Sequence, residues 1–110
     1  MENIKVLAKN YKVEFKTLEE LLEQDNDTES FSYIYGICDT SKHTIFINNE
    51  LDIQEKRITL LHEVLHAIYD QYGENELFSD EEHINKVSVA IAQVLLDNND
   101  LLSLFNTKGE

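Results

Sequence analysis

The sequence has no proline, no tryptophan, only three glycines and a single cysteine. Because Cys38 stands alone, no disulfide can form within the chain, and we expect a protein of the reducing cytoplasm. With so few turn-forming residues of other kinds, most turns must be built from Asn, Asp and Ser. No apolar run approaches the length of a membrane span. The first residues show neither the basic nor the apolar segment that is typical of a signal peptide.

Basic residues are also scarce. Nine Lys and Arg stand against 22 Asp and Glu, which gives a formal net charge of −13. Nucleic acids and anionic membranes repel such a surface, so we expect neither as a partner. The length is that of one domain, and we expect residues 1–110 to form it.

What the sequence does contain is a His-Glu-x-x-His motif within the apolar, helix-forming run 59–68. A helix repeats every 3.6 residues, so His62 and His66 lie one turn apart on one face and can bind the same metal ion. Glu63 leaves the helix about 100° from His62, where it can act on metal-activated water without being a ligand. The structural alternative is a pair of hydrogen-bonded histidines on a core helix, and the spacing favours the metal site.

A catalytic zinc ion usually has three protein ligands, so a third must come from elsewhere. The helix that begins near Ser79 offers four candidates, Asp80, Glu81, Glu82 and His83. On a helical wheel Glu81 lies about 60° and Asp80 about 40° from the core-facing position, whereas Glu82 lies about 160° away. We predict Glu81 as the ligand, with Asp80 as second choice, and Glu82 as the partner of Ser79 in a capping box. Alternatively, these acids only stabilise the helix N-terminus.

The remaining pattern predicts an α+β domain in which a small antiparallel sheet or hairpin packs on two core helices. Alternating apolar residues predict strands at residues 4–16, in two pieces, and at 31–38, and turn-forming residues then lead to a further strand at 43–47. The last two should form an antiparallel hairpin, and the exposed edge of strand 43–47 could bind an extended substrate.

Capping signals mark the predicted helices. Thr17 and Glu20 form a capping box, Gly73 is placed to end the motif helix in the left-handed conformation, and a further helix runs to about Asp97. After it, residues 101–105 have an apolar side that could dock on the domain.

Three segments together resemble a known family. They are the motif run 59–68, Glu81-x-x-Ile84 and residues 92–98. They are similar to small phage- and prophage-encoded zincin-like proteins, distant relatives of the ImmA/IrrE metallopeptidases. The resemblance implies a gluzincin site, with His62 and His66 as ligands, Glu63 as the base and an acidic third ligand at Glu81. It also implies a polypeptide substrate, such as a repressor of the same mobile element.

The function expected from these residues is zinc-dependent peptide hydrolysis, with Glu63 as general base for metal-activated water. The competing interpretation is a non-catalytic module of a phage or mobile element that binds metal or a partner. A base beside an open metal position has no use in a structural site, so Glu63 favours the enzyme. A hydrolase of nucleic acids is disfavoured by the acidic charge.

Overall fold

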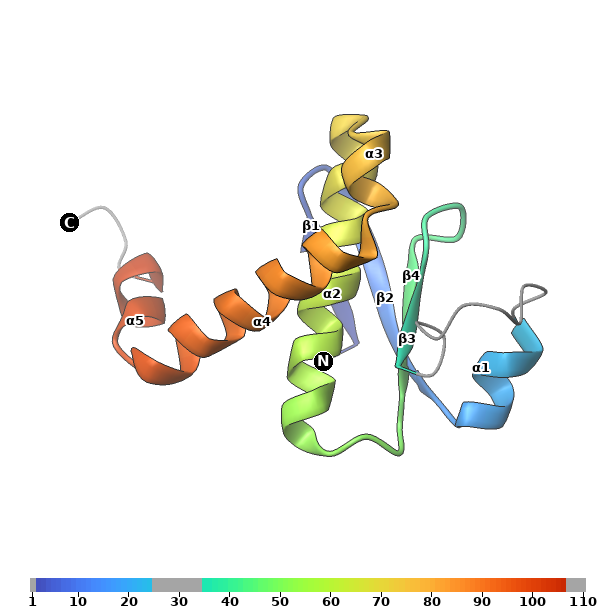
Figure 1. Ribbon diagram of the computed structural model, residues 1–110, viewed down its shortest axis with the longest axis horizontal. Coiled ribbons are helices and arrows are strands. Elements are labelled where there is room, and N and C mark those ends of the chain that lie inside the picture. The colour runs from blue at the N-terminus through green and yellow to red at the C-terminus, as the bar shows by residue number, and fades with distance from the viewer. Residues whose placement is uncertain (1, 25–34, 107–110) are drawn as a thin grey trace.

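The computed structural model describes residues 2–24 and 35–106. Within these ranges the chain forms four strands and five helices in an α+β arrangement, which confirms the predicted fold class (Figure 1). The elements in chain order are β1 (Asn3–Val6), β2 (Lys9–Lys16), α1 (Leu18–Gln24), β3 (Gly36–Asp39), β4 (Thr44–Asn48), α2 (Ile53–Tyr72), α3 (Asn75–Phe78), α4 (Glu81–Asp97) and α5 (Leu101–Asn106).

The four strands form one mixed sheet in the order β1-β2-β4-β3. The predicted hairpin is confirmed, because β3 and β4 pair antiparallel, with Cys38 opposite Ile45. Residues 31–34 of the predicted strand lie outside the described residues. The sheet as a whole is not antiparallel, since β2 and β4 pair parallel. Because β4 therefore has neighbours on both sides, the prediction that its edge is free for substrate was wrong, and β3 forms that edge instead.

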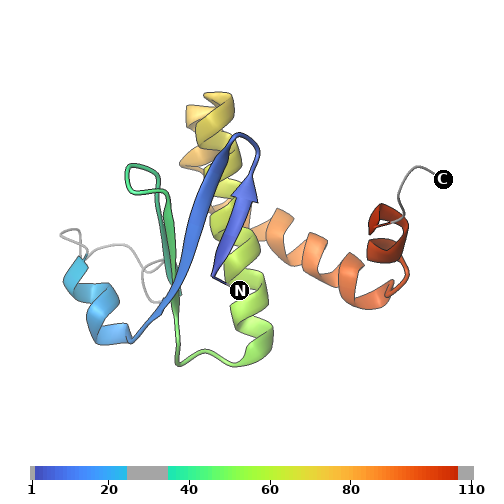
Figure 2. The same ribbon diagram turned by 180° about the vertical axis from the view of Figure 1, so that it is seen from behind.

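The main core lies between the sheet and α2, which crosses one face of it (Figure 2). Alternation along β2 turns Tyr11 and Val13 inward, and both are almost fully buried beside Ile45 and Ile47 of β4. α2 closes this layer with Ala67, which is fully buried. A hydrogen bond links the end of β1 to α2, because the Gln71 side-chain amide donates to the carbonyl of Val6 at 2.6 Å.

Local signals explain where α2 begins and ends. Asp52 is its N-cap, and the carboxylate accepts a hydrogen bond from the backbone N–H of Glu55 at 2.8 Å. At the other end Gly73 adopts φ 72°, the left-handed conformation that glycine reaches without steric cost. Its N–H and that of Glu74 bond back to carbonyls of the last turn. The helix therefore stops at Tyr72, as predicted.

On the side of the sheet away from α2, α1 packs against β2 and β4, while Lys12 and Glu14 of β2 stay exposed (Figure 1). The predicted capping box is present: the backbone N–H of Thr17 donates to the Glu20 carboxylate, and the N–H of Glu20 donates to the Thr17 hydroxyl. Leu21 of this helix is fully buried. With a helix on each face, all five residues of β4 are buried.

α4 packs against α2 and not on the sheet, and its C-terminal part extends away from the body of the molecule (Figure 1). Docking of the segment after α4 was a wrong prediction, because α5 lies at the outer end of α4 with Leu104 and Phe105 exposed by 71% and 76%. In the described part of the chain no helix has the length and apolar character needed to cross a bilayer.

Candidate metal centre

α2 presents both histidines of the motif on one side. His62 and His66 are one turn apart, with ring centroids separated by 5.1 Å. Their side chains are only 13% and 10% exposed. The residues on either side of His66, Leu65 and Ala67, are buried, and Ala67 packs in the core between α2 and the sheet. The two imidazoles are therefore positioned before any ligand arrives.

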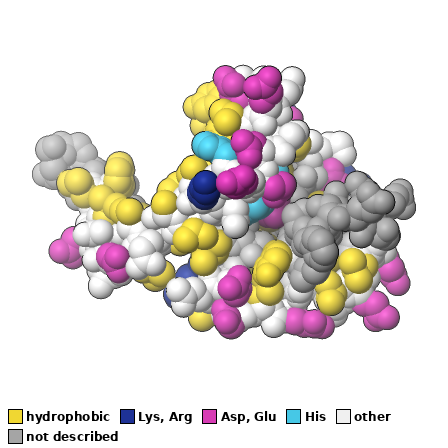
Figure 3. All heavy atoms as spheres, in the orientation of Figure 1, with side chains coloured by type: hydrophobic (Ala, Val, Ile, Leu, Met, Phe, Trp, Pro, Cys, Tyr) yellow, Lys and Arg dark blue, Asp and Glu magenta, His cyan; other side chains and the backbone are white. Residues whose placement is uncertain are grey.

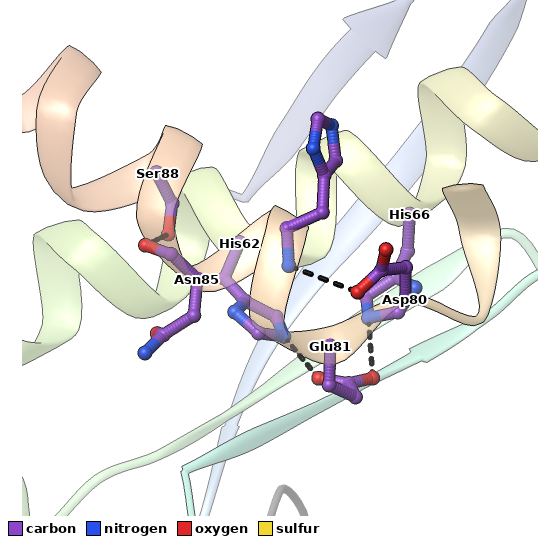
Figure 4. A network of polar contacts seen from close by, with 7 residues as sticks. His62, His66, Asp80, Glu81, Asn85 and Ser88 are labelled. Carbon is purple, nitrogen blue, oxygen red and sulfur yellow. Dashed lines mark hydrogen bonds and ion pairs between the residues drawn. The ribbon is translucent and has the colours of Figure 1, made fainter.

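The first residue of α4 faces this pair. One carboxylate oxygen of Glu81 lies 2.9 Å from Nε2 of His62, and the other lies 3.0 Å from Nε2 of His66. Figure 4 shows Glu81 reaching toward both rings at once. Hydrogen bonding by His62, and then by His66, lowers the pKa of Glu81 to about 2, so this carboxylate is ionised at neutral pH.

The other acids of this turn have different partners. Asp80 is the N-cap of α4, and its carboxylate accepts a hydrogen bond from the backbone N–H of His83 at 3.0 Å (Figure 4). The predicted capping box of Ser79 and Glu82 was wrong, because Asp80 is the N-cap and Glu82 pairs with Lys86. Glu82 points outward, as expected, and pairs with Lys86 at 3.1 Å. Of these three acids, only Glu81 contacts the two motif histidines, His62 and His66.

Glu63 is buried behind the two imidazoles. Its side chain is 4% exposed, and burial, reinforced by the nearby charge of Glu81, raises its pKa well above the usual range. Donor atoms of His62, Glu63 and His66 all lie within 4.8 Å of one another. A carboxylate that is expensive to keep charged accepts a proton readily, which is the property of a general base.

Gly36 makes room for this carboxylate. A Cβ atom at this position would lie 2.6 Å from the carbonyl oxygen of Phe46, 2.9 Å from a methyl of Thr59 and 3.3 Å from an oxygen of Glu63. β3 can therefore run close to α2 only with glycine here. Sequence analysis did not single out Gly36 for the site, although a glycine within an aromatic strand is a signal of close backbone approach.

The donor set fits a metal ion of the zinc type. Two imidazole nitrogens and one carboxylate are the protein ligands of a common class of catalytic zinc sites. The two Nε2 atoms that contact Glu81 are the ones such an ion would use. Nδ1 of His66 is buried and finds no hydrogen-bond partner among the described residues, so that ring has no other polar contact to give up.

Two further contacts at this centre were not foreseen. Phe78 of the short helix α3 packs its ring edge against His66, with centroids 5.0 Å apart. Tyr69 and His83 join α2 to α4 through a hydrogen bond of 2.8 Å between the hydroxyl and Nε2. Both side chains are therefore engaged with each other and not with Glu81.

The geometry agrees with the comparison with known families. Residues 3–109 match the IrrE N-terminal-like domain, a peptidase family. The chain belongs to this family. Searches of curated proteins and of solved structures found no match. The match confirms the resemblance to ImmA/IrrE-like metallopeptidases, and the IrrE-like chain places the family's His-Glu-x-x-His motif on α2 with both histidines facing Glu81.

Proposed function

We propose that this IrrE-like chain is a zinc-dependent peptidase that hydrolyses polypeptides, with His62, His66 and Glu81 as metal ligands and Glu63 as general base. The observation that carries the proposal is the bridging position of Glu81, whose two oxygens contact Nε2 of both motif histidines. This contact unites donors from two helices in the pattern of a catalytic His₂Glu site. Membership of a peptidase family supplies the reaction class.

Each residue has a distinct part in this mechanism. When bound, zinc supplies Lewis-acid chemistry, lowering the pKa of water and polarising a carbonyl group. The Glu63 carboxylate takes a proton from the water molecule as its oxygen adds to the scissile carbonyl. Glu63 then returns this proton to the amine nitrogen that leaves when the C–N bond breaks. Gly36 leaves the space that this carboxylate and the Thr59 methyl group occupy. Among the described strands β3 is the edge strand, it begins beside the cleft residue Tyr35, and it offers backbone groups to an extended substrate.

The decisive experiment compares the wild type with Glu63→Gln. Both proteins are loaded with zinc, their metal content is measured by mass spectrometry, and cleavage is followed on a panel of peptides and unfolded proteins. We expect equal zinc content and a loss of cleavage of at least about 100-fold in Glu63→Gln, because a general base contributes that much. Glu14→Gln, on the exposed side of β2, is the matched control and should behave as wild type.

Two other outcomes would contradict the proposal. Zinc bound at one equivalent without cleavage by the wild type would favour the non-catalytic module. A wild type that binds no zinc after loading at neutral pH would reject the metal site itself.

A further inference from the structure

A cleft of about 610 Å³ opens beside the candidate metal centre. Its volume falls in the range of sites that enclose small ligands or a few side chains. Three of its lining residues are apolar and belong to neither the motif nor the ligand set: Tyr35, Ile58 and Val89. Tyr35 and Val89 are 46% and 44% exposed, so the cleft offers apolar surface to whatever enters it.

The charged lining of this cleft has one sign. Glu55, Glu63, Glu81 and Glu82 all line it, and no Lys or Arg is among its described lining residues. The space-filling view in Figure 3 shows acidic side chains gathered around histidine side chains on this face. Glu63 and Glu81 are occupied by the chemistry proposed above. That leaves Glu55 and Glu82 as charges with no part in it.

These two acids differ in what neutralises them. Glu82 is paired with Lys86 at 3.1 Å, but both side chains are more than three-quarters exposed, so the pair holds Glu82 only weakly. Glu55 forms no ion pair within the described part of the chain. Lys56, the next residue, is turned to the ring of Phe15, 5.6 Å away. Glu55 is therefore the acidic group most available to a ligand.

A buried polar group also faces the cleft. The side chain of Glu63 is 4% exposed and is among the residues that line the cleft. Its carboxylate therefore adds a buried polar group to the inner wall of the cleft. The site is therefore built to receive polar as well as apolar groups, rather than being a gap between helices.

We propose that this cleft selects polypeptide segments in which a Lys or Arg side chain stands beside an aliphatic or aromatic one. The apolar side chain packs against Tyr35, Ile58 and Val89, and the cation lies near Glu55 and Glu82. The inference rests on the proposed function for the identity of the ligand as a polypeptide. The net charge of −13 attracts cations to the whole surface, so the test must separate the cleft from this general field.

The test measures binding of three fluorescein-labelled octapeptides by anisotropy. Their sequences are identical and leucine-rich except for one central position, which is Lys, Gln or Glu. The protein is the zinc-loaded Glu63→Gln variant, in which hydrolysis is blocked. We expect the Lys peptide to bind about two- to fivefold more tightly than the Gln peptide, and the Glu peptide more weakly than both, as for a partly exposed ion pair.

Substitutions assign this preference to the cleft. Adding Glu55→Gln should abolish most of the difference between the Lys and Gln peptides, and Lys86→Gln should increase it, because Glu82 then loses its partner. Glu14→Gln removes the same charge from a distant strand and should leave the preference unchanged. Equal binding of the three peptides, or an equal loss of preference in Glu14→Gln and Glu55→Gln, would overturn the inference.

Failure of the inference can be told from failure of the proposed function. Zinc-dependent cleavage by the wild type with no preference for basic peptides rejects the inference and keeps the peptidase. Preferential binding of the Lys peptide with no cleavage by the wild type keeps the inference and rejects the peptidase.

Discussion

Glu81 decides whether α4 is part of the metal centre. Glutamine keeps the size of the side chain, but its NH₂ group cannot bind metal and its remaining oxygen carries no negative charge. Glu81→Gln should therefore weaken zinc binding by at least about 100-fold, more than is usual for groups that only orient a ligand. Competition with a chromophoric chelator measures this affinity. Asp80→Ala is the contrasting variant.

Asp80 contacts backbone and not imidazole, so its loss should cost about 1 kcal/mol of unfolding free energy as a missing N-cap and should change zinc affinity far less. If Asp80→Ala weakens zinc binding more than Glu81→Gln does, the second choice made from the sequence becomes the better assignment.

The site residues could be predicted from the sequence where a single helix determines their relative positions. His62, Glu63 and His66 are related by helical periodicity alone, so their sequence spacing already places them on neighbouring faces. Glu81 needed an assumption about how α4 folds back, and the wheel angle then separated it from Glu82. Gly36 could not be placed, because its close contacts come from β4 and α2, which are distant in sequence.

At the scale of elements, two polar contacts between described side chains link the start of α4 to α2. One is the Glu81 bridge, and the other is the hydrogen bond between Tyr69 and His83. Tyr69→Phe leaves the part-buried Nε2 of His83 without this partner, and we expect a loss of about 1–2 kcal/mol in unfolding free energy and a severalfold weaker zinc affinity. Urea unfolding and the chelator titration measure the two effects.

Tyr72 provides the control on the same helix. It is 66% exposed, so Tyr72→Phe should change neither stability nor zinc affinity. Equal behaviour of the two variants would show that the Tyr69 hydroxyl does not position α4.

Element boundaries followed from the sequence where a local cap sets them. Thr17 with Glu20 opens α1, Asp52 opens α2 and Gly73 ends it, each through contacts within a few residues. The errors lie where distant segments decide. β4 carries a short apolar run, Ile45 to Ile47, and its parallel pairing with β2 makes it an interior strand. α5 is amphipathic enough to predict docking, but α4 carries it away from the core.

At the scale of the whole molecule, the sheet order β1-β2-β4-β3 is a property that no local pattern specifies. The parallel pair β2 and β4 joins segments separated by α1 and β3, so the hydrophobic pattern predicted the strands but not their neighbours. Charge is the other global property, and the value of −13 means that the chain repels itself and is sensitive to cations of any kind.

Because any cation reduces this repulsion, a test of whether zinc stabilises the fold through the metal site needs a control ion. Zinc at about 100 times its dissociation constant should stabilise the fold by about 2.7 kcal/mol, which raises the melting temperature by about 10–20 °C for a domain of this size. Magnesium at the same concentration screens the carboxylates equally but prefers oxygen ligands, so it should raise the melting temperature far less. Chelation should reverse the zinc effect, and Glu81→Gln should remove most of it. Equal stabilisation by both ions in wild type and Glu81→Gln would mean that the metal only relieves the repulsion of the acidic surface and does not join α2 to α4.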